Sequence, residues 1–141
     1  MTGITDTLLA STLASVDSAE AMVVESAAAL GLDEDARMDL GLAIREAMVN
    51  AVAHGNEYSP DKQVRLILET RTDAVRVTII DQGEGFDLNK VPDPTQGENL
   101  MRESGRGLLL MQAFVDEFSV KRSATGGAEV VLVKYASDTG R

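Results

Sequence analysis

The chain of 141 residues, 44% of them hydrophobic, is long enough for one domain with a sizeable buried core. Its 23 acidic and 13 basic residues give a formal net charge of −10, which argues against general nucleic-acid binding and against docking on an anionic membrane by charge. With no cysteine and one histidine, the sequence excludes disulfides, thiolate zinc sites, cysteine nucleophiles and multi-histidine metal sites. Because it has neither a long apolar run nor a basic secretion signal, we expect a cytoplasmic protein.

The start of the chain is predicted to form a short strand and a first helix. The mixed run Leu8–Val16 predicts an edge strand. Ser15 or Asp17 can cap a helix that runs to about Leu30, and Gly31 is a stop signal for that helix.

A second, longer helix carries a polar stripe on an otherwise apolar surface. Asp33 can cap this helix, which we expect over residues 34–54. At 3.6 residues per turn, one apolar face comprises Leu40, Ile44, Ala47, Met48 and Ala51. Glu46 and Asn50 are four residues apart and stack on another face, while His54 is interpreted as a residue of the helix end.

Glu46 has two interpretations at this stage. A carboxylate among apolar neighbours is costly to bury unless it is paired or lines a cleft. It could therefore form a structural ion pair with an arginine such as Arg106. Alternatively, Glu46 could activate a hydroxyl or water while Asn50 positions a divalent cation.

Alternating hydrophobic residues predict strands in the second half of the chain. The inward positions are expected to be Val64, Leu66, Leu68, Val75, Val77 and Ile79. Residues 71–73 form the predicted turn between these strands, and residues 82–105 show little periodicity, as is typical of functional loops. The remaining expected elements are a helix over residues 107–115, strands at 118–120 and 130–135, and a turn at 125–127. This order predicts an α+β fold, a two-layer sandwich of helices on a mixed, mostly antiparallel sheet.

Two glycine motifs flank the irregular segment. Asp81-Gln-Gly-Glu-Gly-Phe86 follows a predicted strand, so its glycines could admit a ligand and its aspartate could accept a hydrogen bond. Ser104-Gly-Arg-Gly-Leu108 opens an apolar helix, whose free N–H groups could bind a phosphate. Taken alone, the first motif favours a plain turn and the second favours a capped helix after a loop.

The order and spacing of these blocks together resemble the GHKL ATPase superfamily, which includes gyrase, histidine-kinase and mismatch-repair ATPases. Glu46-x-x-x-Asn50, Asp81-x-Gly83-x-Gly85 and Gly105-x-Gly107 look like its N, G1 and G2 boxes. The residues within and around the boxes resemble those of one branch, the bacterial anti-sigma-factor serine/threonine kinases. The resemblance covers about residues 8–135.

This resemblance implies a Bergerat-type ATP-binding fold, a single ATPase domain over residues 1–141 and an ATP lid at about residues 87–104. It implies ATP and Mg²⁺ as cofactors, with Glu46 as the general base and Asn50 as the magnesium ligand. Asp81 would accept a hydrogen bond from the adenine amino group. The other implied nucleotide-binding residues are Gly83, Gly85, Gly105, Arg106, Gly107 and Leu108.

The last strand departs from the family pattern. The family usually has Gly-Thr at its start, where the threonine hydroxyl supports the adenine-binding aspartate, whereas this chain has Gly127-Ala128. A water or Thr125 could replace that hydroxyl, so the change bears on nucleotide affinity rather than on fold.

The resemblance implies an anti-sigma factor that phosphorylates a serine or threonine of an anti-anti-sigma protein and sequesters a sigma factor. A homodimer is expected from the family, and the acidic surface could suit a basic patch on the sigma factor; no direct nucleic acid or membrane partner is expected.

The alternative is a non-catalytic binding module that responds to ATP, to which Ala128 points. A detached histidine-kinase domain is less consistent with the sequence, because little chain precedes the N box for a dimerisation helix. DNA-topology and mismatch-repair ATPases would need a transducer domain for which 141 residues leave no room.

Overall fold

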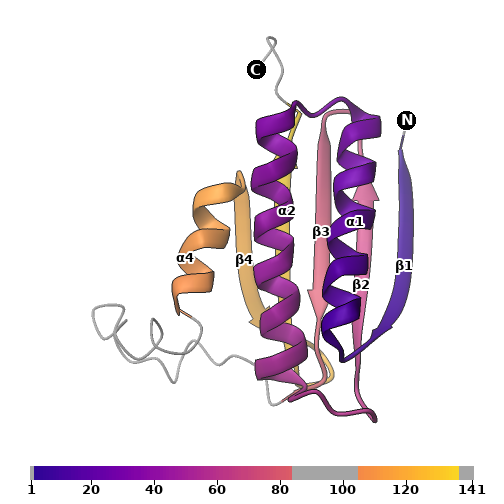
Figure 1. Cartoon of the computed structure of the whole chain (residues 1–141), viewed down its shortest axis with the longest axis vertical. Coiled ribbons are helices and arrows are strands. Elements are labelled where there is room, and N and C mark those ends of the chain that lie inside the picture. Colours follow the sequence, from indigo (N-terminus) through magenta and orange to yellow (C-terminus); the bar gives the residue numbers. More distant parts are fainter. Residues whose placement is uncertain (1, 84–104, 137–141) are drawn as a thin grey trace.

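The computed structural model describes residues 2–83 and 105–136 as one sheet covered on one face by helices (Figure 1). The elements in chain order are β1 (Gly3–Ala10), α1 (Leu13–Leu30), α2 (Glu34–Val49), η1 (Asn50–Gly55), β2 (Gln63–Thr70), β3 (Ala74–Ile80), α4 (Gly105–Phe114), β4 (Glu117–Arg122) and β5 (Ala128–Tyr135). The α+β two-layer prediction is confirmed. Every described strand pair is antiparallel, so this part of the sheet is not mixed as expected.

The five described strands follow the order β1-β2-β3-β5-β4. Side chains that alternate along these strands point to the helix layer, as in the paired positions Leu66 with Ile79 and Val77 with Leu132. These four side chains are almost completely buried. They pack against α1 and α2, which lie side by side across the sheet, and α4 lies beside α2 (Figure 1). The residues of the predicted apolar face of the long helix belong to the same buried core, so that prediction is confirmed.

The N-terminal prediction was wrong in its boundaries. The edge strand is β1, at Gly3–Ala10, rather than residues 8–16, and α1 begins at Leu13. The cap is Thr12, whose hydroxyl accepts a hydrogen bond from the Ser15 N–H, so neither Ser15 nor Asp17 caps the helix. A strand at the sheet edge has little apolar alternation, because its exposed side chains need not be hydrophobic.

The predicted end of the first helix at Gly31 and the predicted cap of the second helix at Asp33 are both confirmed. Gly31 ends α1 in a left-handed conformation, with φ at 102°, and its N–H donates to the carbonyls of Ala27 and Ala28. The Asp33 carboxylate caps α2 by accepting a hydrogen bond from the Ala36 N–H at 2.8 Å.

The long helix changes type at its C-terminal end. The α-helix stops at Val49, and η1, a wider π-helix, continues to Gly55, where one α-helix was expected over residues 34–54. The Asn56 N–H donates to the carbonyl of Ala51, five residues earlier, which is the π spacing. Short π segments of this kind are frequent at functional sites.

The second half of the chain follows the prediction closely. The Arg71 N–H bonds the Ala74 carbonyl across the predicted β2–β3 turn. The last helix begins at Gly105, two residues before the expected start, and both final strands are longer than predicted. None of the described helices is long and apolar enough to cross a membrane.

Candidate functional site

The end of β3, the end of η1 and the start of β5 meet at one end of the sandwich (Figure 1). The structure brings Asp81 directly against this junction. Its N–H donates to the Ala128 carbonyl at 3.0 Å, which joins the end of β3 to the start of β5. Gly55 and Ala128, 73 residues apart in the sequence, therefore share one site.

The Asp81 carboxylate is buried, with 5% of the residue exposed, and is held by backbone donors. Its Oδ1 accepts hydrogen bonds from the N–H of Ala128 and the N–H of Gly83, both at 3.0 Å. Both bonds go to Oδ1; Oδ2, which faces Gly55, accepts no hydrogen bond from the part of the chain that the structure describes. The Thr125 hydroxyl instead lies 3.0 Å from the Ser123 hydroxyl. The described contacts therefore do not bear out Thr125 as the replacement for the family threonine's hydroxyl, and the Asp81 carboxylate is held there by backbone N–H groups.

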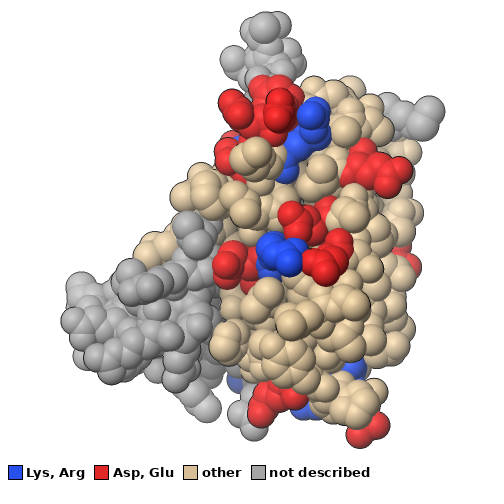
Figure 2. All heavy atoms as spheres, viewed as in Figure 1, with Lys and Arg blue, Asp and Glu red and all other residues tan. Residues whose placement is uncertain are grey.

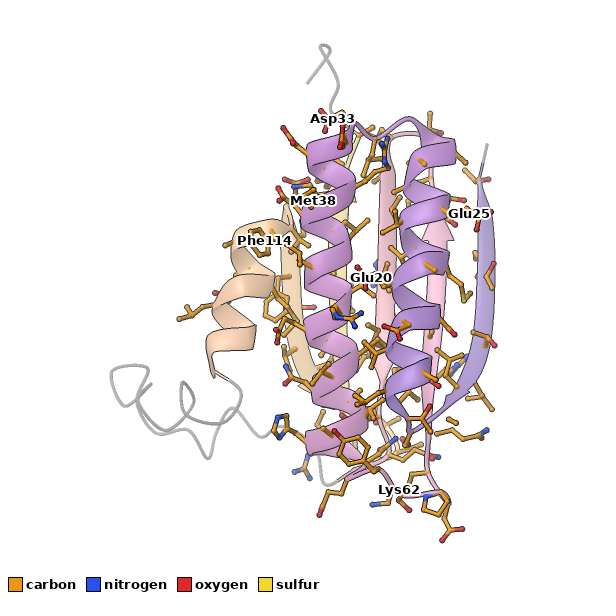
Figure 3. The ribbon with its side chains drawn as sticks, viewed as in Figure 1. Glu20, Glu25, Asp33, Met38, Lys62 and Phe114 are labelled. Atoms are coloured by element: carbon orange, nitrogen blue, oxygen red, sulfur yellow. The ribbon has the colours of Figure 1, made fainter. Side chains whose placement is uncertain are left out.

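Burial raises the pKa of the Asp81 carboxyl above its ordinary value. The hydrogen bonds from the N–H groups of Ala128 and Gly83, and the nearby positive charge of Lys62, oppose that shift in part. Lys62 lies at the same end of the molecule, close to the start of β2 (Figure 3). A desolvated carboxylate of this kind gains from a hydrogen-bond donor supplied by a ligand.

Three glycines allow the backbone segments to approach Asp81 and each other. A Cβ at Gly127 would lie 2.6 Å from the Asp81 carbonyl carbon, and a Cβ at Gly55 would lie 2.5 Å from Asp81 Cγ. A Cβ at Gly83 would lie 2.6 Å from the carbonyl carbon of Gly55. All three distances are shorter than carbon atoms tolerate, so only glycine fits this packing. The sequence singled out Gly83 for ligand access but gave no reason to expect its packing on Gly55.

Asn56 is a buried residue of this region that the sequence analysis did not assign a role. Its side-chain amide donates to Ser11 Oγ at 2.9 Å and to the Gln63 carbonyl at 3.1 Å, and its Oδ1 accepts from the Gln82 N–H at 2.7 Å. The residue has 0% exposure. An asparagine directly after the helix-ending His54-Gly55 pair was the available signal, but its partners come from three distant segments.

Glu46 and Asn50 are half-buried, one turn apart, at the C-terminal end of α2 and the start of η1. Among the described residues, neither side chain has a hydrogen-bond or ion-pair partner. No group of three acidic or histidine residues that could hold a metal ion occurs in the described part of the chain. A cation at Asn50 would therefore need further ligands from outside the described residues, such as the oxygens of a bound molecule. The alternative ion pair with Arg106 lies outside the described side chains.

The second glycine motif forms the first turn of α4, which packs against α2. Its four residues are Gly105, Arg106, Gly107 and Leu108. The first N–H groups of a helix lack partners within the helix and suit an anion. A phosphate-binding role for this turn stays a prediction. Gly85 and the predicted lid at residues 87–104 lie outside the described residues.

A protein-family model described as "Histidine kinase-like ATPase domain" matches residues 9–134. The chain is 29% identical over 115 residues to the serine-protein kinase RsbW of Oceanobacillus iheyensis, covering 77% of this chain and 72% of that protein. It is 35% identical over 99 residues to the anti-sigma F factor of Clostridium beijerinckii, covering 68% of each. It is also 29% identical over 115 residues to the serine-protein kinase RsbW of Bacillus subtilis, covering 77% and 71%. These matches confirm the resemblance drawn from the three boxes.

Proposed function

Because the chain belongs to the histidine kinase-like ATPase domain family, we propose that it is an ATP-dependent serine/threonine kinase and anti-sigma factor. It phosphorylates an anti-anti-sigma partner and sequesters a sigma factor. The observation that carries this proposal is the buried Asp81 carboxylate, fixed through Oδ1 by two backbone N–H groups. The printed names of the relatives, serine-protein kinase and anti-sigma F factor, support the activity and the partner.

The described residues fit an adenine nucleotide. Asp81 Oδ2 accepts a hydrogen bond from the adenine amino group, and the close packing of Gly55 and Gly127 fixes the carboxylate for that contact. Gly83 and Gly85 admit the base. The nucleotide phosphates meet the N–H groups of the first turn of α4, at Gly105, Arg106, Gly107 and Leu108.

Glu46 acts as the general base in this proposal. Its carboxylate accepts the proton of the partner's serine or threonine hydroxyl while the hydroxyl oxygen bonds to the γ-phosphorus. The bond between that phosphorus and the bridging oxygen breaks, and ADP leaves. The side-chain oxygen of Asn50 would hold Mg²⁺, which when bound neutralises charge on the nucleotide phosphates. The place of Glu46 one turn before Asn50, at the end of α2 beside the start of η1, supports this role.

The domain boundaries, the lid and the wider setting are parts of the same proposal. Residues 1–141 form one ATPase domain with its lid at about 87–104, acting on transcription in the cytoplasm, where sigma factors act. The partners are proteins rather than nucleic acid or membrane, and the chain acts as a homodimer. On the helix side, acidic side chains gather around the start of α2, near Asp33 (Figures 2 and 3). This acidic surface favours a basic patch on a protein partner.

The non-catalytic binding module is the rival function. The one sequence feature that pointed to it was Ala128, which lacks the hydroxyl of the family's usual threonine. The backbone N–H of Ala128 donates a hydrogen bond to the Asp81 carboxylate. Two backbone N–H groups hold the Asp81 carboxylate without a hydroxyl at position 128, which supports the nucleotide site over the module.

Transfer of radiolabel from γ-labelled ATP to a cognate anti-anti-sigma protein tests the proposal. We expect an acid-stable phosphate ester on a serine or threonine of that protein. Nucleotide binding measured in parallel, with no label transferred to the partner, would support the module and contradict the kinase.

A further inference from the structure

Building on the proposed adenine contact of Asp81, we propose that Asn56 is a positioning residue that fixes the Asp81–Gly83 loop for adenine selection. Asn56 does not touch the nucleotide in this scheme. It acts through the backbone of Gln82, the residue between the carboxylate and Gly83.

The hydrogen bonds of Asn56 determine the orientation of its amide. Its Oδ1 faces the Gln82 N–H, which can only donate, and its Nδ2 faces the Gln63 carbonyl, which can only accept. Nδ2 also donates to Ser11 Oγ, and the Ser11 hydroxyl in turn donates to the Lys62 carbonyl at 2.7 Å. With no exposed surface, Asn56 therefore joins the Gln82 backbone to β2 and to the segment that precedes α1.

The loop depends on these contacts because regular sheet pairing ends before it. β3 ends at Ile80, and the Asp81 N–H to Ala128 carbonyl bond is the last backbone hydrogen bond between the two strands within the described residues. Beyond it, the Gln82 N–H is held by Asn56, and the Gln82 side-chain oxygen accepts from the Gln63 N–H at 2.6 Å. The next N–H, that of Gly83, is one of the two donors to Asp81 Oδ1. A shift of Gln82 would therefore turn the Gly83 N–H away from the carboxylate.

The chain around Asn56 has an unusual backbone. The next two residues, Glu57 and Tyr58, both adopt left-handed conformations, with φ at 51° and 58°. Neither is a glycine, so both are strained, and such strain is often found at functional sites. This reversal turns the chain from η1 towards β2 directly after Asn56.

Adenine and guanine differ in the group that Asp81 would contact, so the ratio of the ATP and GTP affinities reports the placement of the carboxylate. Adenine presents an amino donor where guanine presents a carbonyl acceptor. A correctly placed carboxylate therefore favours ATP over GTP, and a misplaced one loses that preference. A residue that only stabilised the fold would change the stability without changing the ratio of the two affinities.

The test compares Asn56→Ala, Ser11→Ala and Asp81→Ala in the full chain, with dissociation constants for ATP and GTP and with urea unfolding. We expect Asn56→Ala to lower the ATP-over-GTP preference about tenfold. Ser11→Ala is the matched control, because it removes a partner of Asn56 on the side away from Gln82. It should destabilise the chain yet keep the preference within about twofold.

Three results would overturn the assignment: an unchanged preference in Asn56→Ala, an equal loss in Ser11→Ala, or no loss in Asp81→Ala. The last would refute the proposed adenine contact itself, whereas loss in Asp81→Ala with none in Asn56→Ala would refute the Asn56 inference alone. If Asn56→Ala does not fold, amide hydrogen exchange on the parent chain decides. A Gln82 N–H as protected as the β3 amides supports the role, and one that exchanges like an exposed amide contradicts it.

Discussion

Replacing Gly55 by alanine tests the adenine site without altering the carboxylate that reads the base. The backbone of Gly55 is not in the left-handed region, so an alanine can adopt its conformation. The new Cβ would nevertheless lie 2.5 Å from Asp81 Cγ and 3.0 Å from Asp81 Cβ. Either Asp81 moves or the end of η1 moves away from β3.

The size of the effect follows from these distances. Ordinary contact begins near 3.4 Å, so the Asp81 carboxyl carbon must retreat by about 0.9 Å. The two 3.0 Å hydrogen bonds to Oδ1 would then stretch towards about 4 Å, beyond hydrogen-bonding range. Hydrogen bonds to a charged group contribute about 1.5–3 kcal/mol each, and water can replace part of that loss. We therefore expect the free energy of unfolding to fall by about 3 kcal/mol, and ATP affinity to fall about 10- to 100-fold.

The assay pairs urea unfolding with ATP binding measured by calorimetry. Gly31→Ala is the matched control: it forces an alanine to φ 102° at about 1–2 kcal/mol, with no atom within 4 Å to clash. That variant should lose stability and bind ATP as the parent does. If Gly55→Ala bound ATP with the parent's affinity, the assignment of Asp81 as the adenine contact would be refuted.

Four further predictions follow from the described contacts. Because burial raises the pKa of Asp81, ATP affinity should fall as the pH drops from 7 towards the ordinary aspartate range near about 3.9, and Asp81→Asn should lack this component of the pH profile. The same shift means that Asp81 contributes stability below its ordinary pKa that is lost as the pH rises through the raised value, so Asp81→Asn should flatten this part of the stability curve in urea unfolding. Ala128→Thr should change the ATP dissociation constant less than about threefold in the calorimeter, since the backbone N–H already supports Asp81; a tenfold gain would show that the hydroxyl was needed. Arg45→Ala should leave the urea-unfolding midpoint almost unchanged, because its ion pairs with Asp17 and Glu20 are partly exposed; a clear drop in the midpoint would mean that they are coupled to the core.

Local sequence signals predicted the local structure correctly. Gly31 and Asp33 ended one helix and began the next as expected, because a left-handed C-cap and a side-chain N-cap need only their immediate neighbours. The apolar face around Leu40 and Ile44 was also predictable, since helical spacing alone determines which residues share a face. β1 was misplaced because an exposed edge strand needs few apolar residues.

The candidate site required contacts that the sequence does not record. The donor that supports Asp81 is the N–H of Ala128, and every residue except proline carries an N–H, so residue type gave no sign of it. The partners of Asn56 lie up to 45 residues away, and its role depends on how three segments meet. The change from α- to π-helix at Asn50 was also not visible, because the same apolar residues suit both helices. What the sequence did provide was the order and spacing of the glycine and acidic residues, from which the site could be located.

The central claim is that this chain transfers phosphate from ATP to a hydroxyl with Glu46 as the base. The most direct measurement is the single-turnover rate of label transfer from γ-labelled ATP to a cognate anti-anti-sigma protein, for the parent and for Glu46→Gln, with ATP binding measured on both. We predict transfer to a serine or threonine by the parent, and a rate about 10²- to 10⁴-fold lower for Glu46→Gln at unchanged ATP affinity. An equal rate in the two proteins, or no transfer by a parent that binds ATP, would contradict the claim.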